Sequence, residues 1–137
     1  MDHSLKTRIL IVEDNLDDVD LLMRQLRKAN LGEQVMTISD GRLALDFLML
    51  PEASHLVALF LDLKLPSMSG VQLLEKIRAH DKIRNLPVIV MTSSNSSEDL
   101  QKCTELRVLN YVQKPVTLEA FNKAVASTFH LPDTAAP

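Results

Sequence analysis

Five polar side chains follow closely after four short apolar segments of this chain. Residues that follow parallel strands meet at one edge of a sheet, so side chains in these positions are expected to lie near one another. The five are Glu13 and Asp14 after residues 8–12, Asp62 after residues 57–61, Thr92 after residues 87–91, and Lys114 just beyond residues 108–112.

Three carboxylates held close together repel one another, so either one of them keeps a proton or a cation lies among them. Oxygen ligands without nearby histidine or cysteine suit Mg²⁺. A carboxylate beside Mg²⁺ can attack a phosphoryl group, because the cation neutralises charge on the incoming oxygens. Lys114 can supply the remaining counter-charge and Thr92 a hydrogen bond. This set of residues therefore indicates phosphoryl transfer onto an aspartate.

Each of these residues also has a purely structural interpretation. Glu13 could be an acid at the start of a helix, and Asp62 could begin a turn. Coincidence of such roles at four separate strand ends is less plausible than one shared site. Other acids are interpreted structurally, because they fall in the first turns of a helix and complement its dipole: Asp17, Asp18 and Asp20.

The segments that must position these side chains alternate between strands and helices. Residues 8–12, 57–61 and 87–91 are short and apolar on both faces, which is typical of parallel strands covered by helices on both sides. Residues 35–39 and 108–112 are partly polar and are predicted to be edge strands. Apolar residues recur at helical spacing in 19–26, 71–77 and 118–129, and shorter helices are predicted at 43–49 and 97–107.

A strand followed by a helix, five times over, predicts an α/β fold with right-handed crossovers. The expected architecture is a doubly wound, five-stranded parallel sheet of order 2-1-3-4-5 with helices on both faces. Its crevice is expected between strands 1 and 3. We predict a single domain over residues 1–137, with its core at about 7–130 and a loose tail at 131–137.

Composition excludes several classes of function. With 137 residues, 46% of them hydrophobic and 24% charged, the chain fits one globular domain. The longest purely apolar run, residues 56–61, is too short to span a bilayer, and a single cysteine, Cys103, excludes an intrachain disulfide. A net charge of −3 and five aromatic residues argue against nucleic acid or membrane partners. These features favour the cytoplasm.

The chain resembles the receiver domain of two-component response regulators over about residues 7–130. Four motifs carry the resemblance in the right order and spacing: ILIVEDN at residues 9–15, LFLDLKLPSMSG at 59–70, VIVMTSS at 88–94 and YVQKP at 111–115. The resemblance implies a flavodoxin-like receiver fold and a phosphoacceptor signalling protein. Such a protein is not an enzyme beyond its own Mg²⁺-dependent phosphorylation and dephosphorylation.

The resemblance also implies roles for individual residues. Asp62 is the phosphoacceptor, and it shares Mg²⁺ with Asp14, with Glu13 acting largely through water, and with the backbone carbonyl of Lys64. Thr92 and Lys114 bind the phosphoryl group. The remaining expectations are an aromatic switch residue that swings inward, Tyr111, and a cis peptide bond before Pro115.

Three stretches are similar to single-domain regulators paired with phytochrome-type histidine kinases: residues 13–22 (EDNLDDVDLL), 39–48 (SDGRLALDFL) and 111–115 (YVQKP). The partner implied is a sensor histidine kinase of this type. Subunits in those regulators pair through the region that corresponds to residues 97–129 here, so we expect a homodimer. The chain after the last predicted helix is too short for a DNA-binding module, so output is expected through protein contacts.

Three other functions occur on folds of this kind. A flavin-binding protein of the same topology needs a phosphate cradle after the first strand, where this chain has Glu13 and Asp14. An aspartate-based phosphatase needs a second acid two residues beyond the nucleophile, where Lys64 stands. A pseudo-receiver is an interaction module that has lost phosphorylation. It stays open as the alternative, although every expected site residue is present.

Overall fold

A computed structural model describes residues 7–129 of the chain. Its five strands are β1 (Ile9–Val12), β2 (Val35–Ile38), β3 (Ala58–Leu61), β4 (Val88–Thr92) and β5 (Asn110–Gln113). Its five α-helices are α1 (Leu16–Lys28), α2 (Gly41–Leu48), α3 (Gly70–Ala79), α4 (Ser97–Glu105) and α5 (Leu118–Phe129). Two short 3₁₀ helices, η1 (Gly32–Gln34) and η2 (Pro51–His55), lie in the connections before β2 and β3. The tail expected at residues 131–137 lies outside the described part.

The strands form one parallel sheet of order β2-β1-β3-β4-β5. Every residue of β1, β3 and β4 is buried, whereas β2 and β5 are partly exposed at the two edges. The predicted fold class, strand order and edge strands are therefore confirmed. In the register of the sheet, Val12 pairs with Leu61, so the residues that follow β1 and β3 emerge side by side.

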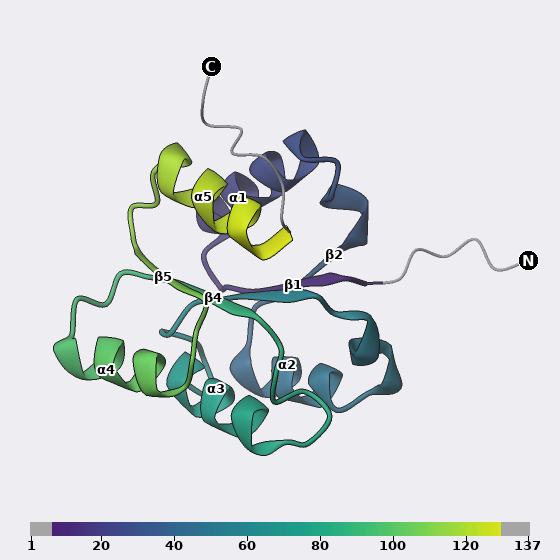
Figure 1. The fold of residues 1–137 in the computed structure, drawn as a ribbon, viewed down its shortest axis with the longest axis vertical. Helices are drawn as coiled ribbons and strands as arrows, with labels where there is room; N and C mark the ends of the chain where they lie inside the picture. The colour runs from purple at the N-terminus through teal and green to yellow at the C-terminus, as the bar shows by residue number, and fades with distance from the viewer. Residues whose placement is uncertain (1–6, 130–137) are drawn as a thin grey trace, which may run out of the picture.

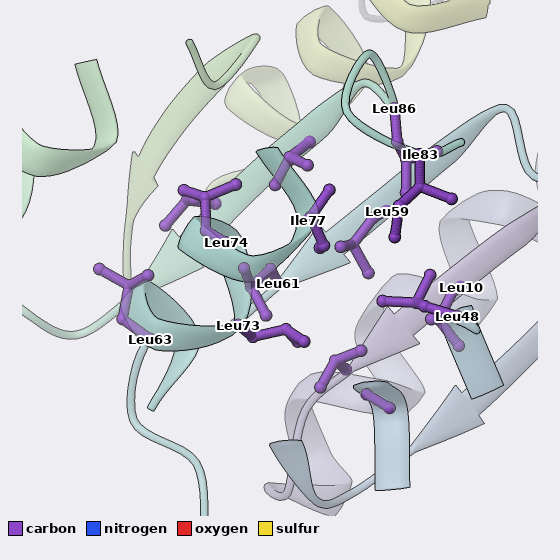
Figure 2. Packing of buried hydrophobic residues seen from close by; sticks show 14 of the residues in the cluster. Leu10, Leu48, Leu59, Leu61, Leu63, Leu73, Leu74, Ile77, Ile83 and Leu86 are labelled. Atoms are coloured by element: carbon purple, nitrogen blue, oxygen red, sulfur yellow. The ribbon is translucent and has the colours of Figure 1, made fainter. Parts of the chain in front are cut away.

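Helices cover both faces of the sheet, with α1 and α5 on one side and α2, α3 and α4 on the other (Figure 1). Each face has its own apolar cluster. Figure 2 shows Leu59 and Leu61 of β3 near Leu73, Leu74 and Ile77 of α3, and Leu10 of β1 beside Leu48 of α2. On the opposite face, Phe60 of β3 stacks on Phe121 of α5 with ring centroids 5.8 Å apart. Because helices pack on both faces of the sheet, the positions of its strand ends are fixed.

Capping moved several predicted boundaries. The predicted helix at 43–49 begins earlier, at Gly41, because the Asp40 carboxylate accepts hydrogen bonds from the backbone N–H groups of Arg42 and Leu43. The predicted strand at 108–112 begins later, at Asn110. Val108 does not join the strand, because its N–H donates a hydrogen bond to the Cys103 carbonyl at the end of α4.

The polar segment of α4 is helical despite its thin apolar stripe. The Ser96 hydroxyl accepts a hydrogen bond from the Asp99 N–H at the start of this helix, and Cys103 is completely buried beneath it. Among residues 7–129, no helix combines the length and the apolar character needed to cross a membrane.

Candidate functional site

Four strand ends bring the predicted polar residues to one edge of the sheet. Backbone hydrogen bonds fix neighbouring pairs: the Asp62 N–H donates to the Val12 carbonyl at 3.0 Å, and the Lys114 N–H donates to the Thr92 carbonyl at 2.7 Å. These bonds continue the ladder of the sheet by one residue beyond each strand. The backbone positions of Asp62 and Lys114 relative to the sheet are therefore fixed by these hydrogen bonds.

Three carboxylates meet at this edge. Glu13, Asp14 and Asp62 each offer an oxygen, and these oxygens lie within 4.8 Å of one another. Glu13 and Asp62 are buried, whereas Asp14 is exposed. Buried carboxylates are unfavourable unless a hydrogen-bond donor or a cation compensates their charge.

One ammonium group supplies part of that compensation. The Nζ of Lys114 lies 2.5 Å from Glu13 Oε1, 2.7 Å from Asp18 Oδ2 and 3.1 Å from Asp62 Oδ2. Burial by itself lowers the pKa of Lys114, but the hydrogen bonds to Asp18 and Glu13 and the charge of Asp62 outweigh it and raise that pKa. Lys114 is therefore a permanent cation at the site.

The carboxylates still carry an excess of negative charge, because one ammonium contacts three of them, and Asp14 adds a fourth. Burial, together with the neighbouring Asp62 carboxylate, raises the pKa of Glu13 from its ordinary 4.5 to about 7, and the hydrogen bond from Lys114 only partly opposes this effect. A group of oxygen ligands with surplus negative charge, open to solvent at Asp14, fits a divalent cation.

Cation binding is expected to depend on pH through Glu13. Below about pH 7 this carboxyl holds a proton that a cation must displace, so affinity should fall up to about tenfold per pH unit, and above pH 7 it should level off. Because the folded pKa is raised, proton uptake stabilises the cation-free fold below pH 4.5, and that contribution is lost as pH rises to about 7.

Titration with Mg²⁺ or Mn²⁺ at several pH values between 5.5 and 8.5, chosen around that pKa of about 7, measures this dependence. The Glu13→Gln variant should bind more weakly with a flatter pH profile. An exposed acid on α3 provides the matched control, Glu75→Gln, which should keep the wild-type profile. An unchanged slope in Glu13→Gln would show that another group titrates.

A second set of contacts runs from the edge of the sheet to α4. The Thr92 hydroxyl accepts a hydrogen bond from the Ser94 N–H at 3.2 Å, and the buried Ser94 hydroxyl donates to Asp99 Oδ2 at 2.6 Å. The Tyr111 hydroxyl donates to the Ser94 carbonyl at 3.2 Å. Ser94 thus connects Thr92, Tyr111 and the first turn of α4.

The structure brings together Glu13, Asp14, Asp62 and Lys114, as the sequence predicted, and Thr92 closes the neighbouring strand. Lys64 is exposed, and its N–H donates to Asp62 Oδ1 at 3.2 Å. The Lys114–Pro115 peptide bond is cis.

Two residues of the site were not assigned to it from the sequence. Asp18 was interpreted as a helix-dipole acid, but its side chain binds Lys114. Its position at the third residue of α1 was the available signal, because helical side chains tilt back toward the helix N-terminus. Ser94 gave no local signal of its links to α4 and Tyr111.

Comparisons with known proteins assign the family. The chain matches the response regulator receiver domain over residues 9–126. The probable methanogenesis regulatory protein FilR2 of Methanothrix harundinacea is 34% identical over 120 residues, which cover 85% of this chain and 77% of FilR2. The chain therefore belongs to the response regulator receiver domain family. Receiver domains are phosphoacceptor signalling modules rather than classical enzymes.

Solved structures agree with this assignment. The Mn²⁺-bound form of the response regulator Rcp1 superposes with a TM-score of 0.76 and 28% identity, covering 96% of this chain and 99% of that one. Rcp1 comes from a Synechocystis species. The bacteriophytochrome response regulator RtBRR gives a TM-score of 0.74 at 35% identity, covering 90% of this chain and 78% of RtBRR. The resemblance to receivers, including phytochrome-associated ones, is confirmed.

Proposed function

We propose that this chain accepts a phosphoryl group on Asp62 from a phosphohistidine of a sensor histidine kinase. The observation that carries the proposal is the placement of a buried aspartate between a cationic Lys114, 3.1 Å from its Oδ2, and two further carboxylates suited to a cation. Of the described carboxylates in that group, Asp62 alone follows the central strand β3. In the sheet, β3 lies between β1, which Glu13 and Asp14 follow, and β4, which ends at Thr92.

The residues divide the work as follows. A carboxylate oxygen of Asp62 attacks phosphorus, a P–O bond forms, and the P–N bond breaks with its electron pair left on the imidazole. Mg²⁺ held by Glu13, Asp14, Asp62 and the Lys64 carbonyl would neutralise charge on the phosphoryl oxygens. Lys114 supplies a donor to one of these oxygens, and Thr92 supplies a hydroxyl to another.

The readout of phosphorylation is proposed to pass through Thr92. If its hydroxyl turns to a phosphoryl oxygen, it gives up the hydrogen bond from the Ser94 N–H. The backbone that also binds Tyr111 is then free to move, and the Tyr111 ring can swing inward. Only a segment with different contacts in the two states can be biased in this way.

A phytochrome-type kinase is the proposed partner. The identity of 35% with the bacteriophytochrome response regulator RtBRR supports it, together with a matching length for most of both chains. The cytoplasm is the proposed location, because that is where a sensor kinase presents its phosphohistidine and because the composition is that of an ordinary globular domain.

The test is labelling by phosphorylated histidine kinase and by a small donor such as acetyl phosphate, each with and without Mg²⁺. We expect one phosphoryl group per chain, removed by hydroxylamine because an acyl phosphate reacts with this nucleophile. A chain that takes no label from either donor would favour the alternative, a pseudo-receiver that acts by binding alone. A hydroxylamine-resistant label would place the group on a hydroxyl instead.

The role of Mg²⁺ predicts opposite effects for Asp14→Asn. Removing this charge should weaken Mg²⁺ binding by roughly 10- to 100-fold and slow phosphorylation, since an exposed ligand is lost. Without Mg²⁺ the variant should melt at a higher temperature than wild type, because repulsion among the carboxylates is relieved. Thermal unfolding with and without Mg²⁺ measures both effects, with Asp20→Asn on the exposed side of α1 as the control.

We further propose a homodimer through the surface of α4, β5 and α5. Exposed leucines support an apolar contact there: Leu100 of α4 (47%) and Leu118 of α5 (53%), with Leu109 (47%) directly before β5. A two-fold pair is the usual form of such self-association.

Charge reversal at two exposed positions of this surface, Glu105→Lys and Lys123→Glu, should dissociate the dimer. Light scattering of phosphorylated and unphosphorylated protein measures it, and Lys76→Glu on α3 is the matched control. If the wild-type chain stays monomeric when phosphorylated, the dimer proposal is wrong. Output through binding of the monomer to another protein would then be favoured.

A further inference from the structure

Asp18 makes a direct ion pair with the site lysine. Its Oδ2 lies 2.7 Å from Lys114 Nζ, closer than the 3.1 Å that separates this ammonium from Asp62. The Asp18 side chain is 33% exposed and that of Lys114 only 13%, so the pair is partly shielded from water. Partial burial strengthens a charge-assisted hydrogen bond relative to an exposed pair.

The start of α1 holds Asp18 in place. Asn15 caps this helix, and its side-chain oxygen accepts a hydrogen bond from the Asp18 N–H at 3.1 Å. The backbone of Asp18 is thereby fixed, and its side chain tilts back toward the edge of the sheet. The neighbouring Asp17 and the nearby Asp20 are exposed.

Asp18 differs in its position from the other two partners of Lys114. Glu13 and Asp62 belong to the group whose oxygens lie close enough to share a cation, and within the described residues that group does not include Asp18. When a cation occupies the site, Glu13 and Asp62 divide their charge between it and the ammonium. Asp18 then remains the partner that serves Lys114 alone.

We propose that Asp18 is a positioning residue for Lys114 in phosphoryl transfer, an inference that rests on the proposed function of Asp62. An ammonium group has three N–H donors on a flexible four-carbon chain. Glu13 and Asp18 bind two of them at short distances, which directs the third toward Asp62. A phosphoryl oxygen arriving at Asp62 meets this third donor already aligned.

Loss of Asp18 has two consequences of opposite sign. Removing a negative charge near the site makes the approach of an anionic phosphodonor easier and would speed labelling. A freely moving Lys114 side chain is less well aligned with the phosphoryl oxygen in the transition state, so labelling is slower. The proposal requires the second effect to dominate, so Asp18→Ala should slow labelling although it lowers the negative charge.

The experiment compares Asp18→Ala with Asp17→Ala, which removes the same charge from the same turn of α1 without touching Lys114. Labelling by acetyl phosphate is followed over a range of donor concentrations in saturating Mg²⁺. We expect the maximal rate of Asp18→Ala to fall about 5- to 20-fold with little change in the donor concentration at half-maximal rate. Asp17→Ala should label as fast as wild type or faster.

A double-mutant cycle separates positioning from a general structural effect. In a Lys114→Met background, Asp18→Ala should change the labelling rate less than twofold, because no ammonium is left to position. Asp18→Asn, which keeps an oxygen acceptor, should recover part of the lost rate in the chain with Lys114. Thermal unfolding of each variant verifies that it is folded under the labelling conditions.

The outcomes are distinguishable. If wild type takes no label, the proposed function fails and the positioning role fails with it. If wild type labels and Asp18→Ala labels at the same rate or faster, only the role of Asp18 is overturned. An equal loss of rate with and without Lys114 would also overturn it, because the effect would not then act through the ammonium.

Discussion

Asp62→Asn is expected to abolish labelling by a phosphorylated histidine kinase and by acetyl phosphate. The amide is a poor nucleophile, so the rate should fall by more than about 1000-fold. The fold should survive, because the side chain lies at the edge of the sheet and the single amide oxygen can still accept a hydrogen bond from the Lys64 N–H or from Lys114 Nζ. Removal of one charge beside Glu13 also relieves repulsion.

Mass spectrometry of the intact chain measures this loss, and circular dichroism with a thermal melt checks the fold. Asp20→Asn, an exposed acid of α1, is the control for a change of one charge and should label normally. Labelling of Asp62→Asn at the wild-type rate would remove Asp62 from the mechanism. The hydroxylamine test would then have to locate the true acceptor.

Gly70→Ala is expected to destabilise the fold by about 2–4 kcal/mol. A Cβ at Gly70 would lie 2.4 Å from the Asp62 carbonyl oxygen and 2.6 Å from the Leu63 Cα, both of them backbone atoms. The backbone next to the phosphoacceptor must therefore shift. Labelling should slow as well, because Asp62 moves relative to Lys114.

Urea unfolding measures the change in stability, and Gly32→Ala is the matched control. A Cβ at Gly32 would meet the Cγ of Arg27 at 2.6 Å, but this atom belongs to an exposed side chain, whereas the nearest backbone atom is 3.4 Å away. Its cost should therefore be smaller than that of Gly70→Ala. If Gly70→Ala is as stable as wild type, the backbone between β3 and α3 can shift to accept the added Cβ at little cost in free energy, and the prediction is wrong.

The sequence was sufficient to predict the sheet and its order. Uninterrupted apolar segments mark strands buried on both faces, and polar ones mark edges, because burial acts on each segment separately. Once the strands are predicted, the residues that follow them are predicted to lie at one edge of the sheet. This places Glu13, Asp62 and Lys114 there. Boundaries were less accurate where a cap decides them, as Asp40 does for α2.

Three features of the site depended on the tertiary structure. The contact of Asp18 with Lys114 joins residues 96 positions apart, and the place of Asp18 in the first turn of α1 indicates an acid near the sheet edge without naming Lys114 as its partner. The raised pKa of Glu13 depends on burial by several elements and on the distance to Asp62. The links of Ser94 to Thr92, Asp99 and Tyr111 need two strands and a helix in place.

The physical reason is the range of each interaction. Hydrophobic periodicity and strand ends are properties of a few consecutive residues, so the sequence by itself determined which segments are buried or edge strands and which acids and lysine follow them. Charge pairing and desolvation act through space at a few ångströms. Only the packed structure decided that Lys114 is shared by three carboxylates and that one of them is Asp18.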